Sequence, residues 1–311
     1  MTPLPTPRAH RSGDPLRFIA PSGPIDQNHF DRGLAVIRHA LPGSPLHAPE
    51  TVRARSGYFA GSDAERLESL RAGLADPEAR VLWCARGGYG LTRLLHRLDP
   101  SILREGPKLI VGFSDITALL AWALEAAGLS SLHGPVASQL TELDEDSRSR
   151  VFDMIRGELP VPLIAEEGTT LCGGRVEGPL IIGNLEVLRS LVGTPFMPSL
   201  QGRILAIEEV GERPYRIDRA LTQLIQSGAL RGVRGIAVGQ LTRCDDPDNA
   251  KYKGPQAREV VVERLEGLGV PVVTGFEFGH ERRRNVALPF GRMARLDADN
   301  ACLECLEPAA T

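Results

Sequence analysis

The 311-residue sequence lacks a basic excess and a long hydrophobic run. Its formal net charge of −3 argues against a nucleic-acid-binding face, which needs clustered lysine and arginine. The longest apolar runs are far shorter than a membrane span requires. Residues 1–16 contain proline and arginine but no apolar stretch of the kind found in secretory signals, and we expect a flexible tail there. We therefore expect neither nucleic acid nor membrane as a partner.

The sequence also lacks the even number of cysteines that a disulfide-stabilised fold needs. Its five cysteines are spread along the chain, which is typical of a protein in a reducing cytoplasm. Cys302 and Cys305 form a CxxC motif without a second pair, so we expect them in or near a final strand rather than in a zinc or redox site. No cluster of ligand residues has zinc-binding spacing, and we expect no metal and no cofactor. The five cysteines are Cys84, Cys172, Cys244, Cys302 and Cys305.

What the sequence does contain is ordinary for a globular protein, with 42% hydrophobic and 24% charged residues. Its length suggests two domains. Strand and helix patterns alternate through the first half, which predicts an α/β domain with a mainly parallel sheet over 17–160. Residues 161–174 are rich in Pro, Thr and Gly and are expected to be a linker, followed by a second domain over 175–311.

One strand-turn-helix pattern contains a single serine, Ser114. Leu109–Val111 reads as a buried strand, Gly112 permits a sharp turn, and an Ala/Leu-rich helix begins near Thr117. A serine at this point suits a nucleophile, because the free N–H groups of the helix N-terminus favour an oxyanion. It also suits a helix cap, which is a common position for serine. The turn resembles the G-x-S-x-G nucleophile elbow but has Ile116 in place of the second glycine, which disfavours an ordinary α/β-hydrolase.

The loop Arg86-Gly87-Gly88-Tyr89-Gly90 follows a buried strand and precedes a helix expected over 91–98. It lacks the Lys-Ser/Thr of a P-loop and the spacing of a dinucleotide-binding loop. Adjacent glycines allow the backbone to approach a ligand closely. We expect a glycine N–H here, assigned to Gly88, to form an oxyanion hole with the Asp115 N–H, since both loops follow parallel strands.

A serine hydrolase also needs a base and an acid that orients it. Of the seven histidines, His133 could line a cleft, and His280 closes a turn after a strand. Among the acids, Glu208 stands where an apolar strand ends. These patterns alone do not bring Ser114, Glu208 and His280 together in space.

Several motifs occur in one order along the chain and together resemble the LD-carboxypeptidase (muramoyltetrapeptide carboxypeptidase) family of serine peptidases. The resemblance runs from about Phe18 to about Leu296. The motifs are Phe59-Ala60-Gly61, Arg86–Gly90, Gly112–Asp115, Gly183-Asn184-Leu185, Ile207–Glu212, Pro214–Arg219 and Gly275–His280. Glu209 stands where the family commonly has Asp, and the chain has a proline-rich N-terminal extension.

The resemblance implies a triad with Ser114 as nucleophile, Glu208 as acid and His280 as base, which would join both domains. It implies a flavodoxin- or Rossmann-like N-terminal domain and a smaller C-terminal α/β domain, swivelling or barrel-like. It also implies a cytoplasmic enzyme, usually a homodimer, that uses no metal and removes terminal D-alanine from murein tetrapeptides in peptidoglycan recycling.

An exopeptidase must bind a free carboxylate, and Arg86 beside Gly87 is the candidate because a guanidinium binds a carboxylate through two parallel hydrogen bonds. A structural salt bridge beneath the glycine loop is the other explanation for Arg86. Three further functions stay open: a related self-immunity peptidase that acts on a peptide-nucleotide antibiotic, a non-catalytic nucleotide or sugar binder on an α/β fold, and an inactive scaffold.

Overall fold

The computed structural model describes residues 6–247, 250–251 and 254–311. The chain divides into two compact units. Unit 1 contains the chain up to Pro160 together with Val286–Gly291 and Pro308–Thr311, and unit 2 contains Val161–Asn285 and Arg292–Glu307. None of the helices in the described part of the chain is long and apolar enough to cross a membrane.

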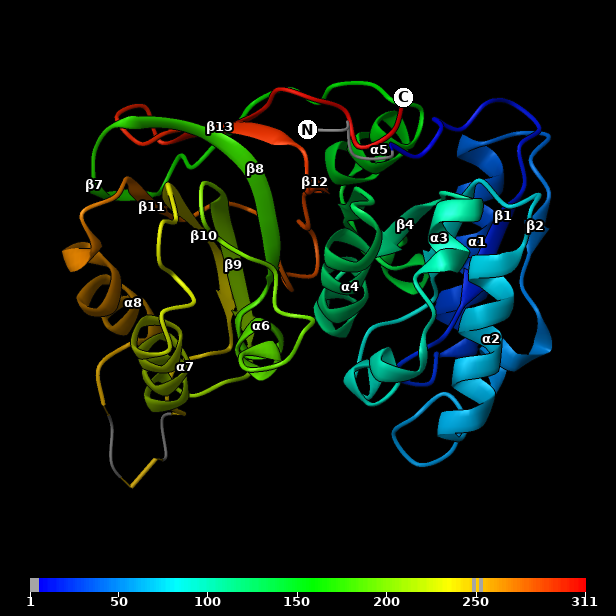
Figure 1. Ribbon diagram of the computed structural model, residues 1–311, viewed down its shortest axis with the longest axis horizontal. Coiled ribbons are helices and arrows are strands. Elements are labelled where there is room, and N and C mark those ends of the chain that lie inside the picture. Colours follow the sequence, from blue (N-terminus) through cyan, green and yellow to red (C-terminus); the bar gives the residue numbers. More distant parts are fainter. Residues whose placement is uncertain (1–5, 248–249, 252–253) are drawn as a thin grey trace. The chain divides into compact units, whose positions relative to one another are not determined.

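Unit 1 is built on a six-stranded sheet with the order β12-β5-β4-β3-β1-β2 (Figure 1). β1 to β5 are parallel, and β12 pairs antiparallel with β5. The order 2-1-3-4-5 is that of flavodoxin-like folds, in which ligands bind at the carboxyl ends of the strands near the β1/β3 switch point. The strands are β1 (Leu16–Ile19), β2 (Leu46–His47), β3 (Val81–Cys84), β4 (Leu109–Gly112), β5 (Ser131–His133) and β12 (Leu288–Phe290).

Helices pack on this sheet because each presents an apolar face. The helix α2 begins with a capping box between Ser62 and Glu65, and α4 is buried along its first eight residues. Trp83 of β3 packs edge-on against Phe152 and donates its indole N–H to the Pro135 carbonyl at 2.9 Å. The helices of unit 1 are α1 (Gln27–Ala40), α2 (Asp63–Ala75), α3 (Ser101–Glu105), α4 (Thr117–Ala127) and α5 (Glu145–Ile155).

Unit 2 contains a curled mixed sheet of eight strands with the order β6-β14-β13-β8-β9-β10-β11-β7 (Figure 1). The neighbours β8, β9, β10 and β11 are parallel, and the outer strands join them antiparallel. The elements are β6 (Leu163–Ile164), β7 (Thr169–Cys172), β8 (Arg175–Asn184), α6 (Leu185–Leu191), β9 (Ile204–Val210), α7 (Pro214–Gln226), β10 (Gly235–Thr242), α8 (Ala257–Leu265), β11 (Val272–Thr274), β13 (Met293–Asp297) and β14 (Cys302–Cys305).

The two-domain α/β fold expected from the sequence is confirmed, and the CxxC motif forms β14 as expected. Three local expectations are wrong. The segment 161–174 is not a plain linker, because β6 and β7 lie in it and pair with β14 and β11. The expected helix over 91–98 is two separate 3₁₀ turns, Leu91–Arg93 and Leu95–Arg97.

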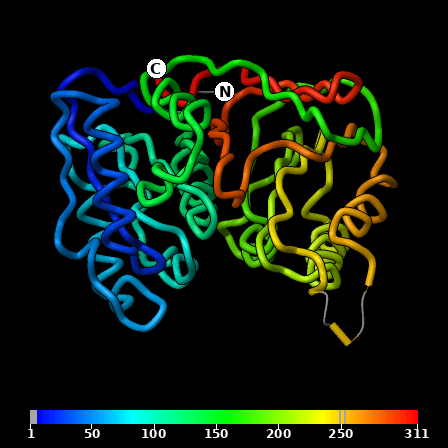
Figure 2. Tube along the Cα trace, turned by 180° about the vertical axis from the view of Figure 1, so that it is seen from behind, coloured from blue at the N-terminus to red at the C-terminus, as the bar shows by residue number. Residues whose placement is uncertain are grey.

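The third difference is the N-terminal segment. Residues 1–5 of the expected tail lie outside the described residues, but residues from Thr6 onward are held in place. The Ala9 N–H donates to the Thr311 carbonyl at 2.8 Å, and the Thr311 N–H donates to the Pro7 carbonyl at 2.9 Å. Figure 2 shows the start of the described chain beside its C-terminal end. A local pattern cannot reveal this pairing, because the partners come from opposite ends of the sequence.

Candidate active site

Three loops of unit 1 meet at the carboxyl ends of β1, β3 and β4. The Gly23 N–H after β1 donates to the Gly87 carbonyl after β3 at 2.9 Å. A Cβ added at Gly87 would lie 2.9 Å from Ser114 Cβ and 3.3 Å from Ser114 Oγ. The glycine loop expected to approach a ligand therefore packs directly on the serine, and only glycine fits at position 87 without displacing it.

Ser114 has a φ of +64°, in the left-handed region that non-glycine residues seldom adopt. Such a conformation costs on the order of 1–2 kcal/mol and persists only where the surrounding structure imposes it, often at functional sites. The side chain is half-buried. Neither the 3₁₀ turn Ser114–Ile116 nor α4 has a side-chain cap, so the helix-cap interpretation of Ser114 is wrong. A strained serine in a strand-to-helix turn is the geometry of a nucleophile elbow.

The carboxyl group of Asp115 joins the serine turn to the glycine loop. Its side chain is 3% exposed, and Oδ2 accepts the Leu91 N–H at 3.0 Å. Burial raises the pKa of Asp115, while this hydrogen bond and the positive charge of Arg66 act in the opposite direction. Asp115 therefore fixes the end of the glycine loop relative to Ser114.

Arg66 of α2 is a supporting residue that the sequence patterns did not reveal. Its guanidinium is fully buried, forms an ion pair with Asp63 at 2.6 Å, and donates Nη1 hydrogen bonds to the carbonyls of Pro21 and Gly90. It thus ties the loops after β1 and β3 together. The only sequence signal for Arg66 was its spacing of three residues from Asp63 at the start of the helix. The other partners of Arg66 are backbone carbonyls, which every residue has, so the sequence does not indicate them.

Arg86 donates an Nη1 hydrogen bond to the Pro24 carbonyl. Among the described residues it has no carboxylate within ion-pair distance, so the structural salt bridge considered above is not formed there. Arg86 lines a pocket of about 480 Å³ in unit 1, and two tyrosines that share this pocket, Tyr58 and Tyr89, are 69% and 51% exposed. The pocket is lined by Gly23, Pro24, Arg55, Gly57, Tyr58, Arg86, Gly88 and Tyr89.

Unit 2 brings two of the expected site residues into contact. Glu208, near the end of β9, is fully buried, and its Oε2 lies 2.6 Å from His280 Nδ1. The histidine side chain is 16% exposed. A short hydrogen bond to a buried carboxylate fixes the orientation of the imidazole ring, as the acid of a catalytic triad does. His133 instead lies fully buried in β5 with its ring against Phe113, which places it in the core rather than at a cleft.

Glu209 has a different role from its neighbour, because successive strand residues point to opposite faces. It is 2% exposed and accepts hydrogen bonds at 2.8 Å from Asn184 Nδ2 and from the Glu186 and Val210 N–H groups. It therefore supports the start of α6. Burial, with a smaller contribution from the Glu208 charge, raises the pKa of Glu209 to about 7 despite these donors.

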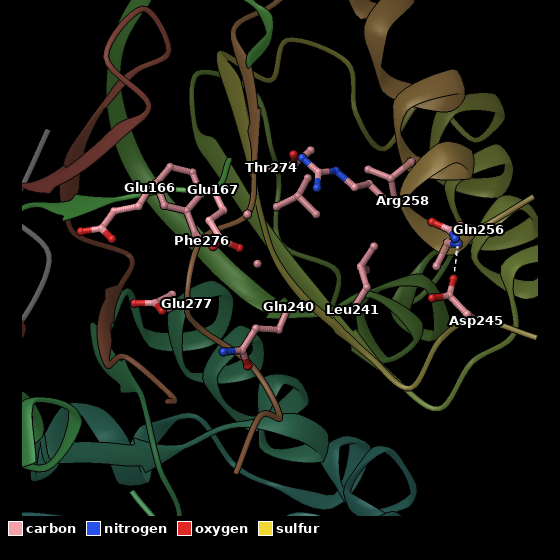
Figure 3. Close-up of a pocket in the computed structure, with 15 residues that line it drawn as sticks. Glu166, Glu167, Gln240, Leu241, Asp245, Gln256, Arg258, Thr274, Phe276 and Glu277 are labelled. Carbon is pink, nitrogen blue, oxygen red and sulfur yellow. Dashed lines mark hydrogen bonds between the residues drawn. The ribbon is translucent and has the colours of Figure 1, made fainter. Parts of the chain in front are cut away.

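A larger pocket of unit 2, about 600 Å³, lies beside the ends of β10 and β11 (Figure 3). Glu166 and Glu167 lie at one side of it, and Asp245 and Gln256 at the other. Glu208 and His280 are not among the residues that line it. This pocket is therefore separate from the Glu208–His280 pair.

Comparison with known proteins matches residues 16–134 to the LD-carboxypeptidase N-terminal domain and residues 177–296 to the LD-carboxypeptidase C-terminal domain. A putative carboxypeptidase of Streptomyces coelicolor is 39% identical over 99% of this chain and 98% of its own. The murein tetrapeptide carboxypeptidase of Pseudomonas aeruginosa is 33% identical over 91% of this chain and 93% of its own.

Solved structures share the two-domain fold. The muramoyltetrapeptide carboxypeptidase of Oxalobacter formigenes superposes with a TM-score of 0.80 at 29% identity, covering 93% of this chain and 97% of that one. The microcin C7 self-immunity protein superposes with a TM-score of 0.85 at 24% identity, covering 99% of this chain and all of that one, a likeness that concerns the fold alone. From the two domain matches and these relatives, this chain belongs to the LD-carboxypeptidase family and is a serine-type carboxypeptidase.

Proposed function

We propose that the enzyme cleaves the L,D-peptide bond that releases terminal D-alanine from murein tetrapeptides, with Ser114, Glu208 and His280 as its catalytic triad. The observation that carries the proposal is the contact of 2.6 Å between His280 and the fully buried carboxylate of Glu208. The left-handed backbone of Ser114 supports the nucleophile assignment. The names of the relatives from Pseudomonas and Oxalobacter support the substrate.

In the proposed reaction, Ser114 Oγ attacks the carbonyl carbon of the residue before the terminal D-alanine. His280 Nε2 takes the hydroxyl proton and then passes it to the leaving amine as the peptide C–N bond breaks. Glu208 accepts the hydrogen bond from His280 Nδ1–H throughout. Water then attacks the acyl-serine with His280 again acting as base, which returns the enzyme and releases the tripeptide. The proposal requires Ser114 of unit 1 and His280 of unit 2 to act on the same bond.

The loops beside Ser114 supply the remaining groups. We assign the oxyanion hole to the N–H groups of Gly88 and Asp115, because Gly87 packs on the serine and Asp115 follows it. Arg86 and Gly87 are assigned to the terminal carboxylate. Arg86 uses Nη1 on the Pro24 carbonyl, and a guanidinium with five N–H groups retains donors for a ligand.

The family resemblance further supports a cytoplasmic enzyme that acts in peptidoglycan recycling as a homodimer without a metal cofactor. A mass measurement on the purified protein in solution tests the oligomeric state separately from the activity.

The decisive experiment is mass spectrometry of a murein tetrapeptide digest. We expect the loss of one D-alanine with the wild-type enzyme and no loss with Ser114→Ala. An intact tetrapeptide after prolonged incubation with the wild-type enzyme would contradict the proposed substrate.

A second candidate is a self-immunity peptidase that acts on a peptide-nucleotide antibiotic, favoured by the fold shared with the microcin C7 self-immunity protein. Incubating the enzyme with both substrates separates the two functions. The Arg86–Gly90 sequence, in its resemblance to the murein enzymes, favours the tetrapeptide.

A further inference from the structure

The segment that carries His280 has no regular secondary structure. Residues 275–285, after β11, lie outside every helix and strand. A side chain on such a segment is held only by the individual contacts that the segment makes. The contact with Glu208 orients the imidazole ring, but it does not by itself fix the backbone on either side of position 280.

Gln240 of β10 holds this backbone at three points. Its own N–H donates to the Phe278 carbonyl at 3.0 Å, two residues before the histidine. Its side-chain Oε1 accepts the Glu281 N–H at 2.9 Å, and its Nε2 donates to the Arg284 carbonyl at 2.8 Å. The donor and the acceptor of the amide are thus both used, and His280 lies between the points of attachment.

A register shift in the sheet makes this possible. The pairing of β10 with β9 is regular up to Val238 and resumes one step out of register at Leu241. Bulges of this kind release backbone groups from the ladder and re-aim side chains, and they are frequent beside active sites. Here the irregular step includes Gln240, whose N–H bonds the Phe278 carbonyl instead of a neighbouring strand.

Packing at Gly279 shows how closely the groups fit. Gly279 has a φ of +138°, and a Cβ added to it would lie 3.0 Å from Gln240 Oε1 and 3.2 Å from Glu208 Cβ. Gln240 and Glu208 therefore both pack against Gly279, directly beside the histidine. The Gly279 N–H donates to Asn285 Oδ1 at 3.2 Å, so Asn285 at the end of the 275–285 segment contacts the residue next to His280. Figure 3 shows Gln240 at the edge of the larger pocket, on the side away from Arg258 and Gln256.

We propose that Gln240 is a positioning residue for His280: its amide fixes the 278–284 backbone so that the imidazole Nδ1 meets Glu208 and Nε2 is oriented to act on the substrate. The inference rests on the proposed function of His280 as the base. It assigns to Gln240 an effect on the chemical step and none on substrate affinity, because Gln240 acts through the histidine.

The test compares Gln240→Leu, which removes both amide interactions, with Gln240→Glu, which keeps the acceptor for the Glu281 N–H and loses the donor to the Arg284 carbonyl. A misplacement of about 1 Å in a reacting group costs on the order of 100-fold, so kcat for tetrapeptide cleavage should fall about 10- to 100-fold in Gln240→Leu. The loss should be smaller in Gln240→Glu, and KM should stay within about threefold in both, as expected for an interaction used in the chemical step.

Gln223→Leu is the matched control. Gln223 of α7, in the same unit, accepts a hydrogen bond from Arg189 and lies outside the contacts of the 275–285 segment described above. We expect its kcat to equal that of the wild type. A rise in KM with unchanged kcat in Gln240→Leu would overturn the proposal, because it would show a role in binding.

A second readout does not depend on catalysis. The proton between His280 Nδ1 and Glu208 should give a low-field NMR resonance, identified by its absence in Glu208→Gln. We expect it to broaden or shift in Gln240→Leu and to persist in Gln223→Leu. An unchanged resonance would refute the positioning role. If His280→Ala retained full activity, the proposed function would fail, while the resonance would still decide whether Gln240 holds the histidine.

Discussion

Gly87→Ala tests whether the glycine loop and Ser114 form one reacting centre. Gly87 does not have a left-handed backbone, so alanine is allowed there by its conformation. The new Cβ would lie 2.9 Å from Ser114 Cβ, whereas ordinary contacts begin near 3.4 Å, so one of the two must move by about 0.5 Å. The neighbouring contact at 3.3 Å is the Phe113 backbone carbonyl, which cannot rotate away.

The magnitude follows from this displacement. Overpacking of a filled site costs about 1–3 kcal/mol of stability. Displacing a nucleophile by a fraction of an ångström should lower kcat by on the order of 10- to 100-fold, which corresponds to about 1.4–2.7 kcal/mol in the activation barrier. The assay is D-alanine release from the tetrapeptide at saturating substrate, with thermal unfolding measured on the same samples.

Gly73→Ala is the matched control. Its Cβ would lie 2.8 Å from Ile19 Cγ2 and Leu82 Cδ1, in the core of the same unit and away from Ser114. We expect a comparable or smaller loss of stability and wild-type kcat. If Gly87→Ala kept wild-type kcat, the packing of the glycine loop on Ser114 would have no role in catalysis.

Three further outcomes are expected. Ser114→Ala should lower kcat by about 10⁴-fold or more with the fold intact, and Ser114→Ala combined with His280→Ala should be no worse than either alone; additive losses would mean that the two do not act together. Arg86→Lys keeps the positive charge but loses the two parallel hydrogen bonds that a guanidinium makes to a carboxylate, so kcat/KM should fall about tenfold and the preference for terminal D-alanine over L-alanine should weaken. If both values were unchanged, Arg86 would have only a structural role. The pKa of Glu209 is raised from 4.5 to about 7 in the folded state, so its contribution to stability is complete below pH 4.5 and is lost as pH rises through 7, by about 3 kcal/mol. Glu209→Gln should therefore flatten the fall of Tm between pH 5 and 8, and parallel curves for the two proteins would refute this assignment.

Local patterns identified the separate pieces of the candidate site. The strand, turn and helix around Ser114 were expected at their observed positions, because periodicity and a glycine turn are local properties. The strained φ of Ser114 was not expected, since many serines in such turns have ordinary dihedrals. The contact between Glu208 and His280 spans 72 residues, and only the family resemblance suggested it.

Residues that act through backbone groups were missed. Arg66 and Gln240 bind carbonyl and N–H groups of distant loops, and every residue except proline offers the same N–H, so no partner type marks such a contact in the sequence. The same reason explains the N-terminal segment from Thr6 onward, whose partners are the backbone groups of Ile155 and Thr311. The sequence patterns therefore predicted which side chains lie at strand ends, but not the backbone hydrogen bonds that hold those side chains in place.

The return of the C-terminal chain to unit 1 determines when this enzyme can finish folding during its synthesis. β12 pairs with the Ser131–His133 edge of the first sheet, and Thr311 pairs with the N-terminal segment. After Pro160 is synthesised, 130 residues must still be made before β12 is complete at Phe290. At about 5–20 residues per second, the edge of β5 stays unpaired for about 7–26 s after Pro160 is made. An unpaired edge is a template for pairing with other chains, so the nascent protein is most exposed to aggregation before β12 emerges.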